Sequence, residues 1–135
     1  MSVFTVTLPN RCGELARLCE AMAASGINLV LCATTRKADG VVAFIADDEA
    51  SAEAVLQEAG LPYGMRPALT IRMDNQPGTG AATFRKLADA GVSTDLLLPV
   101  RISDSLFFAV ICVDDPDEAV SALGEQVVPG ANLVS

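Results

Sequence analysis

The order of apolar and polar residues predicts two similar halves built of alternating strands and helices. Residues 2–8 alternate apolar and hydroxyl side chains, which is typical of a half-buried strand. Further along, Leu15, Leu18, Cys19 and Met22 recur at the spacing of one helix face. The predicted elements of the first half are strand 2–8, helix 14–25, strand 27–35, a hairpin turn at 37–40, strand 41–46, a helix after Asp47-Asp48, and an edge strand over 61–66.

The same order of elements returns in the second half. Its predicted elements are strand 68–73, helix 79–90, paired strands 92–102 and 106–113, helix 117–123, and a closing strand within 127–134. Phe84, Leu87 and Ala88 are expected to form the core face of helix 79–90. Each half reads β-α-β-β-α-β, so we predict an α+β, ferredoxin-like fold repeated twice, with helices on one face of each antiparallel sheet. The predicted domains are residues 1–66 and 67–135.

A short loop is repeated between the first strand and the first helix of each half. Asn10 matches Asn75, and Gly13 matches Gly78, at one fixed offset. Glycine adopts backbone angles that other residues avoid, and a helix N-terminus presents unpaired N–H groups that suit a carboxylate or phosphate. The loops are interpreted either as ligand-binding sites or only as tight turns in which the asparagine caps or shapes the turn.

Charge and composition exclude several classes of function. The chain has 135 residues and a net charge of −8, and its nine basic residues are scattered, whereas a nucleic-acid binder needs a basic face. No apolar run is long enough to span a membrane and no secretion signal is visible, so we expect a cytoplasmic protein. Hydrophobic residues make up 51% of the chain. Because modules this small bury a limited core, we expect a homo-oligomer.

The residue types argue against catalysis, a cofactor and a metal site. The sequence contains no histidine, the commonest general acid–base group. Acidic pairs precede a helix in both halves, and their symmetry favours helix capping over metal binding: Asp47-Asp48 and Asp114-Asp115. Three cysteines are expected to be small core residues: Cys19, Cys32 and Cys112. Cys12 lies in the first loop, where a reactive thiol is the alternative interpretation.

The loops and the helices after them resemble the ACT domain family, whose small βαββαβ modules bind amino acids. The second copy matches the family pattern in the run 75–82, Asn-Gln-Pro-Gly-Thr-Gly-Ala-Ala, and then at Phe84, Leu87, Ala88, Gly91, Val92 and Asp95. The first copy keeps Asn10, Gly13, Leu15, Ala16, Leu18, Gly26, Ile27 and Asn28. It departs from the pattern at Cys12, where the family prefers proline, and this makes the first loop the less certain site. The resemblance covers the whole chain as two tandem modules.

The resemblance also implies a location for the ligand. In that family the ligand lies at the seam between two modules, against the strand-to-helix loop and the start of the strand after the helix. By position this implicates, in the first copy, Asn10, Arg11, Cys12, Gly13, Ile27, Asn28 and Leu29. In the second copy it implicates Asn75, Gln76, Pro77, Gly78, Val92, Ser93 and Thr94.

These observations predict a regulatory or sensor protein that binds an amino acid or a similar small metabolite and is not an enzyme. The alternative is a protein–protein interaction subunit of a metabolic enzyme or transporter, with vestigial ligand pockets. An RNA-binding module shares this order of elements but stacks bases on sheet aromatics, and aromatic residues make up only 4% of the chain.

Overall fold

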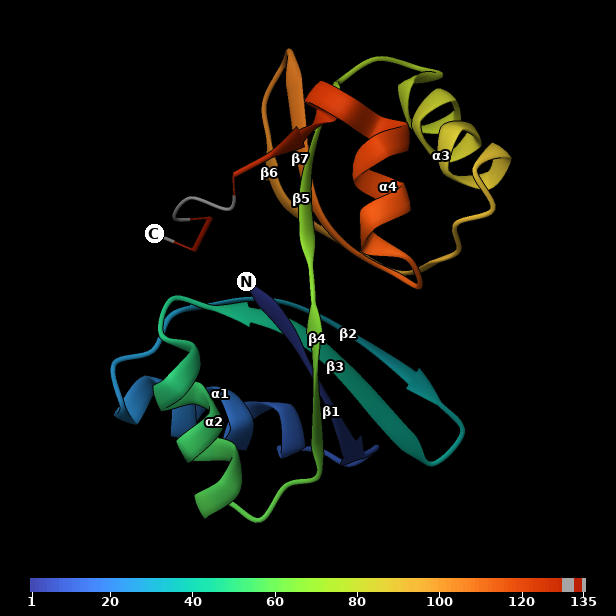
Figure 1. Ribbon diagram of the computed structural model, residues 1–135. Coiled ribbons are helices and arrows are strands. Elements are labelled where there is room, and N and C mark those ends of the chain that lie inside the picture. The colour runs from blue at the N-terminus through green and yellow to red at the C-terminus, as the bar shows by residue number, and fades with distance from the viewer. Residues whose placement is uncertain (130–132, 135) are drawn as a thin grey trace. The chain divides into compact units, whose positions relative to one another are not determined.

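The computed structural model describes residues 1–129 and 133–134, which form two modules. The first module comprises residues 2–66 with Val134, and the second comprises Met1 with the described residues between Pro67 and Leu133. The first module contains β1 (Ser2–Pro9), α1 (Glu14–Ala24), β2 (Leu29–Arg36), β3 (Asp39–Ala46), α2 (Glu49–Glu58) and β4 (Tyr63–Pro67) (Figure 1). The second contains β5 (Leu69–Asp74), α3 (Thr79–Asp89), β6 (Thr94–Ile102), β7 (Leu106–Val113), α4 (Pro116–Leu123), the 3-10 helix η1 (Gly124–Gln126) and β8 (Val127–Val128).

Each module contains one four-stranded sheet in which the first strand is central. The strand order is β2-β3-β1-β4 in the first module and β6-β7-β5-β8 in the second. β1 runs antiparallel to β3, with Phe4 opposite Phe44. β5 runs antiparallel to β7, with Ile71 opposite Ala109. The predicted ferredoxin-like fold is therefore confirmed in both copies.

Alternation along the strands builds the core of the first module. Phe4 and Phe44 stack with ring centroids 5.0 Å apart and planes 7° from parallel. Since successive strand residues face opposite sides of a sheet, the aligned row from β1 and β3 meets α1 and α2 on one face (Figure 1). The other buried members of this cluster are Val6, Leu8, Leu18, Met22, Ile27, Val42, Ala52 and Leu56. Full burial of one such large side chain contributes about 1.5–3 kcal/mol.

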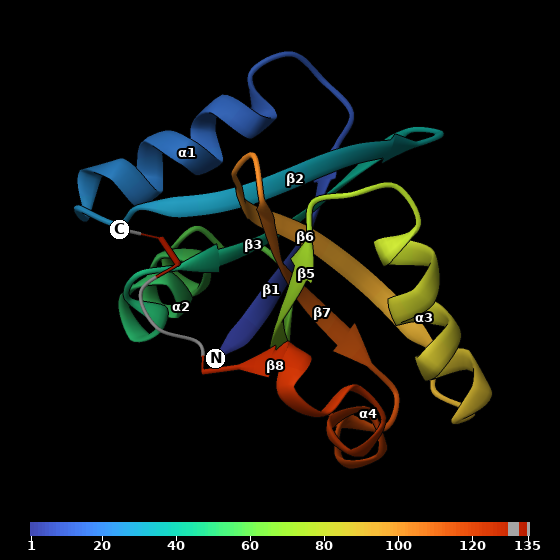
Figure 2. The ribbon, with the colours of Figure 1, turned by 90° about the horizontal axis from the view of Figure 1, so that it is seen from above.

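The second module repeats this core with smaller strand residues. α3 packs beside α4 over the second sheet (Figure 2). The buried cluster comprises Ile71, Met73, Leu87, Val92, Ala109, Ile111, Val113, Ala119 and Leu123. Phe4 corresponds to Leu69 at the offset of 65, and Leu69 lies opposite Ile111, so the second core has no stacked phenyl pair at this place.

The buried face of α3 differs from the predicted one. Leu87 is buried and Phe84 is half-buried, as expected, but Ala88 is exposed. The residue that completes the buried stripe is Thr83, which is only 1% exposed and lies one turn before Leu87. A search for apolar periodicity overlooks this position because it scores threonine as polar.

The prediction for Cys32 was wrong, whereas Cys112 is buried as expected. Cys32 is exposed on β2, an edge strand, and pairs with Ala43. Directly opposed residues share a face, and Ala43 alternates with the core residues Val42 and Phe44. Cys32 therefore faces away from the helices. Cys19 is half-buried on α1 and Cys12 is exposed.

Several strand boundaries also differ from the prediction, since β2 begins at Leu29 rather than at residue 27 and β6 begins at Thr94 rather than at residue 92. The hairpin between β2 and β3 turns at Lys37 and Ala38, with Arg36 opposite Asp39, so the turn is shorter than 37–40. The predicted closing strand is limited to β8, which pairs antiparallel with β5. Of the remainder of 127–134, residues 130–132 lie outside the described part of the chain.

The acidic pairs cap helices as predicted, through their second members. The carboxylate of Asp48 accepts a hydrogen bond from the Ser51 N–H at 3.0 Å and another from the Ser51 hydroxyl at 2.6 Å. Asp115 accepts from the N–H of Glu118 at 3.1 Å at the start of α4. Each bond from a backbone N–H satisfies a donor that the first helical turn would otherwise leave unpaired.

Replacement of Asp48 by asparagine should change the pH dependence of stability. The Ser51 hydroxyl, followed by the Ser51 N–H, lowers the pKa of the Asp48 carboxyl. A lowered folded-state pKa stabilises the fold above the unfolded-state value of about 3.9, and this contribution is lost as the pH falls through the folded-state value. The difference in unfolding free energy between wild type and Asp48→Asn should therefore shrink in urea titrations below about pH 4. Ser51→Ala should give the same trend, and a difference independent of pH would contradict it.

Candidate functional site

The two repeated loops have the same backbone conformation. Gly13 and Gly78 are the N-cap residues of α1 and α3, with φ angles of 90° and 91°. This left-handed region is costly for residues with a side chain. A Cβ atom at either glycine would meet nothing within 4 Å, so backbone conformation rather than crowding accounts for the glycines. No side chain caps either helix, so neither Asn10 nor Asn75 has the predicted alternative role of a cap.

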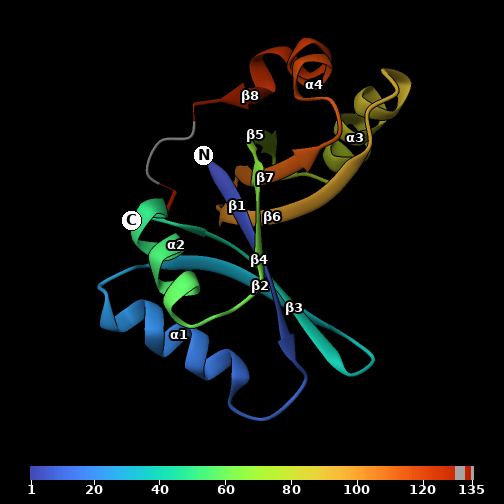
Figure 3. The ribbon, with the colours of Figure 1, turned by 60° about the horizontal axis from the view of Figure 1, so that its bottom comes forward.

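Each loop is held against the hairpin of its own module. The N–H of Asn10 donates to the carbonyl of Ala38 at 2.8 Å, and the N–H of Asn75 donates to that of Ser105 at 3.0 Å. Asn75 also donates from Nδ2 to the carbonyl of Ser103 at 2.6 Å. Figure 3 shows the β1–α1 loop and the β2–β3 hairpin at the same end of the first module. These bonds fix the position of each loop relative to the hairpin of its module.

A pocket lies beside each loop. The pocket of the first module has a volume of about 220 Å³ and lies between the loop, the first turn of α1 and strands β2 and β3. The pocket of the second module has about 230 Å³ in the corresponding position. Four predicted site residues line these pockets: Asn10, Arg11, Asn75 and Gln76. The lining does not include Cys12, Gly13, Pro77 or Gly78.

The two loop pockets differ in chemistry. Arg11 in the first is replaced by Gln76 at the same place in the second. Nη2 of Arg11 lies 3.0 Å from Oε1 of Glu14, and the Arg11 side chain is 71% exposed. Because a guanidinium has five N–H donors, this pairing leaves Arg11 with donors for an anion in the pocket. Phe84 and Phe107 line the second pocket together with Asp74, Asn75 and Gln76, so the described residues of its lining offer no cationic side chain for an anion.

The other predicted site residues lie at the far end of the first helix. Ile27, Asn28 and Leu29 follow α1, and its 11 residues separate them from the loop by about 16 Å. Val92, Ser93 and Thr94 follow α3 in the same way. The side chains of Ile27 and Val92 belong to the cores. Neither module by itself brings its loop and its strand start together.

The backbone at these strand starts already has partners. The N–H of Asn28 donates to Oδ1 of Asp47 at 3.0 Å, and the N–H of Asp47 donates back to the carbonyl of Asn28 at 3.2 Å. Ser93 and Asp114 exchange the same two bonds, at 2.9 and 3.2 Å. The first member of each acidic pair therefore holds the residue just before β2 or β6. The sequence shows two consecutive aspartates in each half, and the capping prediction accounts only for the second aspartate of each pair.

The side chain of Asn28 is engaged as well. Its Oδ1 accepts from the N–H of Leu29 at 3.1 Å, and its Nδ2 donates to the carbonyl of Val134 at 2.7 Å. A ligand at Asn28 would have to replace these bonds.

Within the described part of the chain, no group of three histidine, cysteine, aspartate or glutamate side chains could hold a metal ion. None of the helices described is long and apolar enough to cross a membrane.

Comparison with known proteins assigns the same fold to the whole chain. The sequence profile described as the ACT domain pair matches residues 1–127. A structure from Bacteroides thetaiotaomicron is similar with a TM-score of 0.88 and 22% identity, over 99% of this chain and 95% of that one. The regulatory subunit of aspartate kinase from Thermus thermophilus, in a ligand-free form, is similar with a TM-score of 0.68 and 17% identity, over 93% and 90%. The corresponding subunit from Thermus flavus is similar with a TM-score of 0.65 and 19% identity, over 93% of this chain and 90% of that one. No curated protein sequence matches significantly.

Replacement of Gly78 by alanine should destabilise the protein through backbone conformation alone. Its φ of 91° lies in the left-handed region, where a Cβ costs about 1–2 kcal/mol, and no neighbour adds a clash. Gly80 is the matched control because it lies two residues further on, inside α3, again with open space around it. Gly80→Ala should stabilise by up to about 1 kcal/mol. Urea unfolding measures both changes, and changes of the same sign would contradict this account.

Proposed function

This chain belongs to the ACT domain pair family, and we propose that it is a non-catalytic, cytoplasmic regulatory protein that binds an amino acid or a similar small metabolite. The observation that carries the proposal is the loop pocket of the first module, where Arg11 lies beside the N-terminus of α1. A guanidinium and a helix N-terminus both favour a carboxylate. A pocket of about 220 Å³ has the size for a molecule as small as an amino acid.

The polar groups around this pocket supply partners for both charges of an amino acid. Arg11 provides N–H donors for the α-carboxylate. Asn10, whose backbone is tied to Ala38, and Glu14 line the same pocket and provide oxygen atoms for the α-ammonium. On these grounds we assign the carboxylate-binding role to the first loop, although the second matches the family pattern more closely.

The known structures with this fold agree with a regulatory role. Two of them are regulatory subunits of aspartate kinase, and this chain covers 90% of each. In our proposal the strand starts that complete the site, at Asn28 and Ser93, come from a different module than the loop. Occupancy of such a site would be linked to the packing of modules or to the assembly of a homo-oligomer.

The alternative, an interaction subunit, is favoured by one observation. β2 is an edge strand whose last five residues, 32–36, are all exposed. An exposed edge presents unpaired backbone groups that another strand can extend. Failure of all amino acids to bind, together with recovery of one stoichiometric partner protein, would select this function.

A titration separates the loop pocket from its surroundings. We expect isothermal titration calorimetry against the twenty amino acids to give saturable heat with at least one of them. Arg11→Gln should weaken that binding by about tenfold or more, as expected for loss of a charge-assisted bond. Arg17→Gln is the matched control: Nη1 of Arg17 lies 3.3 Å from the same Glu14 Oε1, and its side chain is equally exposed at 71%. Arg17 is not among the residues that line the loop pocket.

If Arg11→Gln and Arg17→Gln weakened amino-acid binding equally, Arg11 would not be the residue that binds the carboxylate. Absence of heat and of any thermal shift with all twenty amino acids would remove the proposed function itself.

A further inference from the structure

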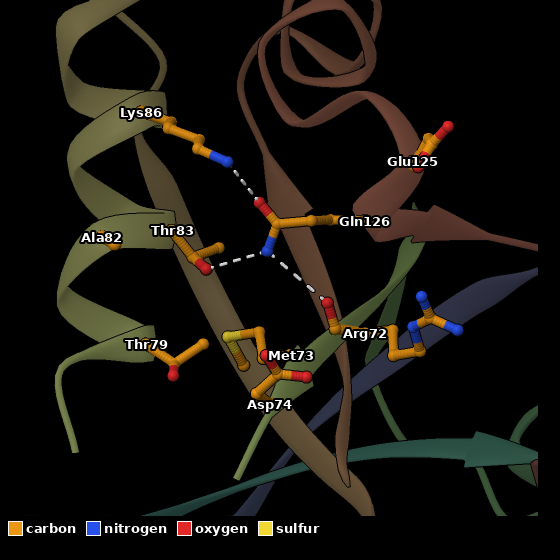
Figure 4. A pocket seen from close by; sticks show the side chains of 9 residues that line it. All are labelled: Arg72, Met73, Asp74, Thr79, Ala82, Thr83, Lys86, Glu125 and Gln126. Atoms are coloured by element: carbon orange, nitrogen blue, oxygen red, sulfur yellow. Dashed lines mark hydrogen bonds between the residues drawn. The ribbon is translucent and has the colours of Figure 1, made fainter. Parts of the chain in front are cut away.

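A second groove lies on the opposite flank of α3 from the loop pocket. It has a volume of about 280 Å³ and is bounded by the end of β5, α3 and η1 (Figure 4). Thr79, Thr83 and Lys86 of α3 line the groove, whereas Gly80 and Phe84 of the same helix line the loop pocket. The groove and the loop pocket thus lie on different flanks of α3, and Met73 and Asp74 line both.

Three polar side chains converge in this groove. Gln126 donates from Nε2 to Oγ1 of Thr83 at 2.9 Å and to the carbonyl of Arg72 at 3.5 Å. Lys86 donates from Nζ to Oε1 of Gln126 at 2.9 Å. Thr83, Lys86 and Gln126 are called here the polar triad, and Figure 4 shows their side chains pointing toward one another. Thr83 and Lys86 fix the orientation of the Gln126 amide, whose oxygen faces the Lys86 ammonium.

The first module has a groove of about 240 Å³ in the same position, lined mostly by apolar residues together with Glu14 and Arg17. The members of the polar triad, each reduced by the offset of 65, correspond to Leu18, Ala21 and Leu61, and all three line that groove. The fold thus forms this groove twice, and in the first module apolar side chains fill the three positions of the triad. Polar side chains have a desolvation cost that apolar ones lack, so packing alone gives no reason for the triad in the second module.

The charges around the triad define what it could bind. One of the three ammonium donors of Lys86 bonds to Gln126, which leaves two for a ligand. Figure 4 shows the side chains of Arg72 and Glu125 extending away from the triad. The Lys86 ammonium is therefore the cation that a ligand at the triad would meet. Asp74 also lines the groove and would repel a second negative charge.

We propose that this groove is a binding site for small monocarboxylates that carry a hydroxyl group, present only in the second module. The carboxylate accepts from Lys86 Nζ, and the ligand hydroxyl donates to Oε1 of Gln126. The site is independent of the amino-acid pocket proposed for the first loop, because it uses other residues in the other module.

The site can be tested with L-lactate as the probe, followed by NMR of the full chain at constant ionic strength. The side-chain amide of Gln126 and the backbone amide of Thr83 should show saturable shifts in the millimolar range. Lactamide, which has the same shape without the charge, and malate, which has a second carboxylate, should each bind about tenfold more weakly or worse.

Two variants assign the binding to the triad. Lys86→Met should weaken lactate binding by about tenfold or more. Lys37→Met is the matched control, because Lys37 is the other lysine of the sequence and lies in the hairpin turn of the first module. The triple variant Thr83→Leu, Lys86→Ala, Gln126→Leu copies the first module at these three positions, where the fold already accommodates leucine, alanine and leucine. It should remain folded by amide spectrum and lose lactate binding.

Absence of saturable shifts with lactate, equal binding of lactate and lactamide, or binding retained in the triple variant would each overturn the proposal. None of these outcomes bears on calorimetry with amino acids at Arg11, so the two sites stand or fall separately.

Discussion

Antiparallel pairing between the first and third strands is the constraint on which each module depends. In the first module it sets Phe4 opposite Phe44, and in the second it sets Met73 opposite Phe107. A slip of one residue would turn every core side chain of the strand to the other face. The same register determines where the strand ends, and with it where the loop leaves the sheet toward the helix. The pockets beside the loops are thus a consequence of how the sheets are paired.

The backbone of the loops has been kept between the two copies, while the side chains around them differ. The left-handed glycines and the bonds from Asn10 and Asn75 to the hairpins have nearly the same geometry in both modules. The side chains at equivalent positions change charge or polarity, as at Arg11 and Gln76. Duplication of this kind supplies two copies of one scaffold, and each copy is free to acquire a ligand chemistry of its own.

Much of the fold could be predicted because local patterns and tertiary structure agree. Strand alternation, the helical stripes and the caps at Asp48 and Asp115 depend on residues close together in sequence. Burial of Thr83 could not be read in this way, since its partner Gln126 lies 43 residues further on. Exposure of Cys32 follows from the edge position of β2, which becomes visible only when the strand order is known.

The site was less predictable than the fold because its contacts join residues that are far apart in sequence. The sequence identified the loops, and the structure places pockets beside them, with Asn10, Arg11, Asn75 and Gln76 in the walls. It did not indicate that Asp47 and Asp114 occupy the backbone donors at the strand starts. Gly80 takes the place that Leu15 has in the first copy, and because Leu15 is 39% exposed this difference removes little buried surface.

α3 lies between the loop pocket and the groove of the second module. Gly80 and Phe84 line the loop pocket, and Thr83 and Lys86 line the groove. A rigid helix cannot shift one flank without moving the other. Any molecule that displaces this helix on one side therefore changes the shape offered to a molecule on the opposite side. By thermodynamic reciprocity, the second would alter the affinity of the first to the same degree. Two ligands of the second module would therefore be coupled through the position of α3 alone.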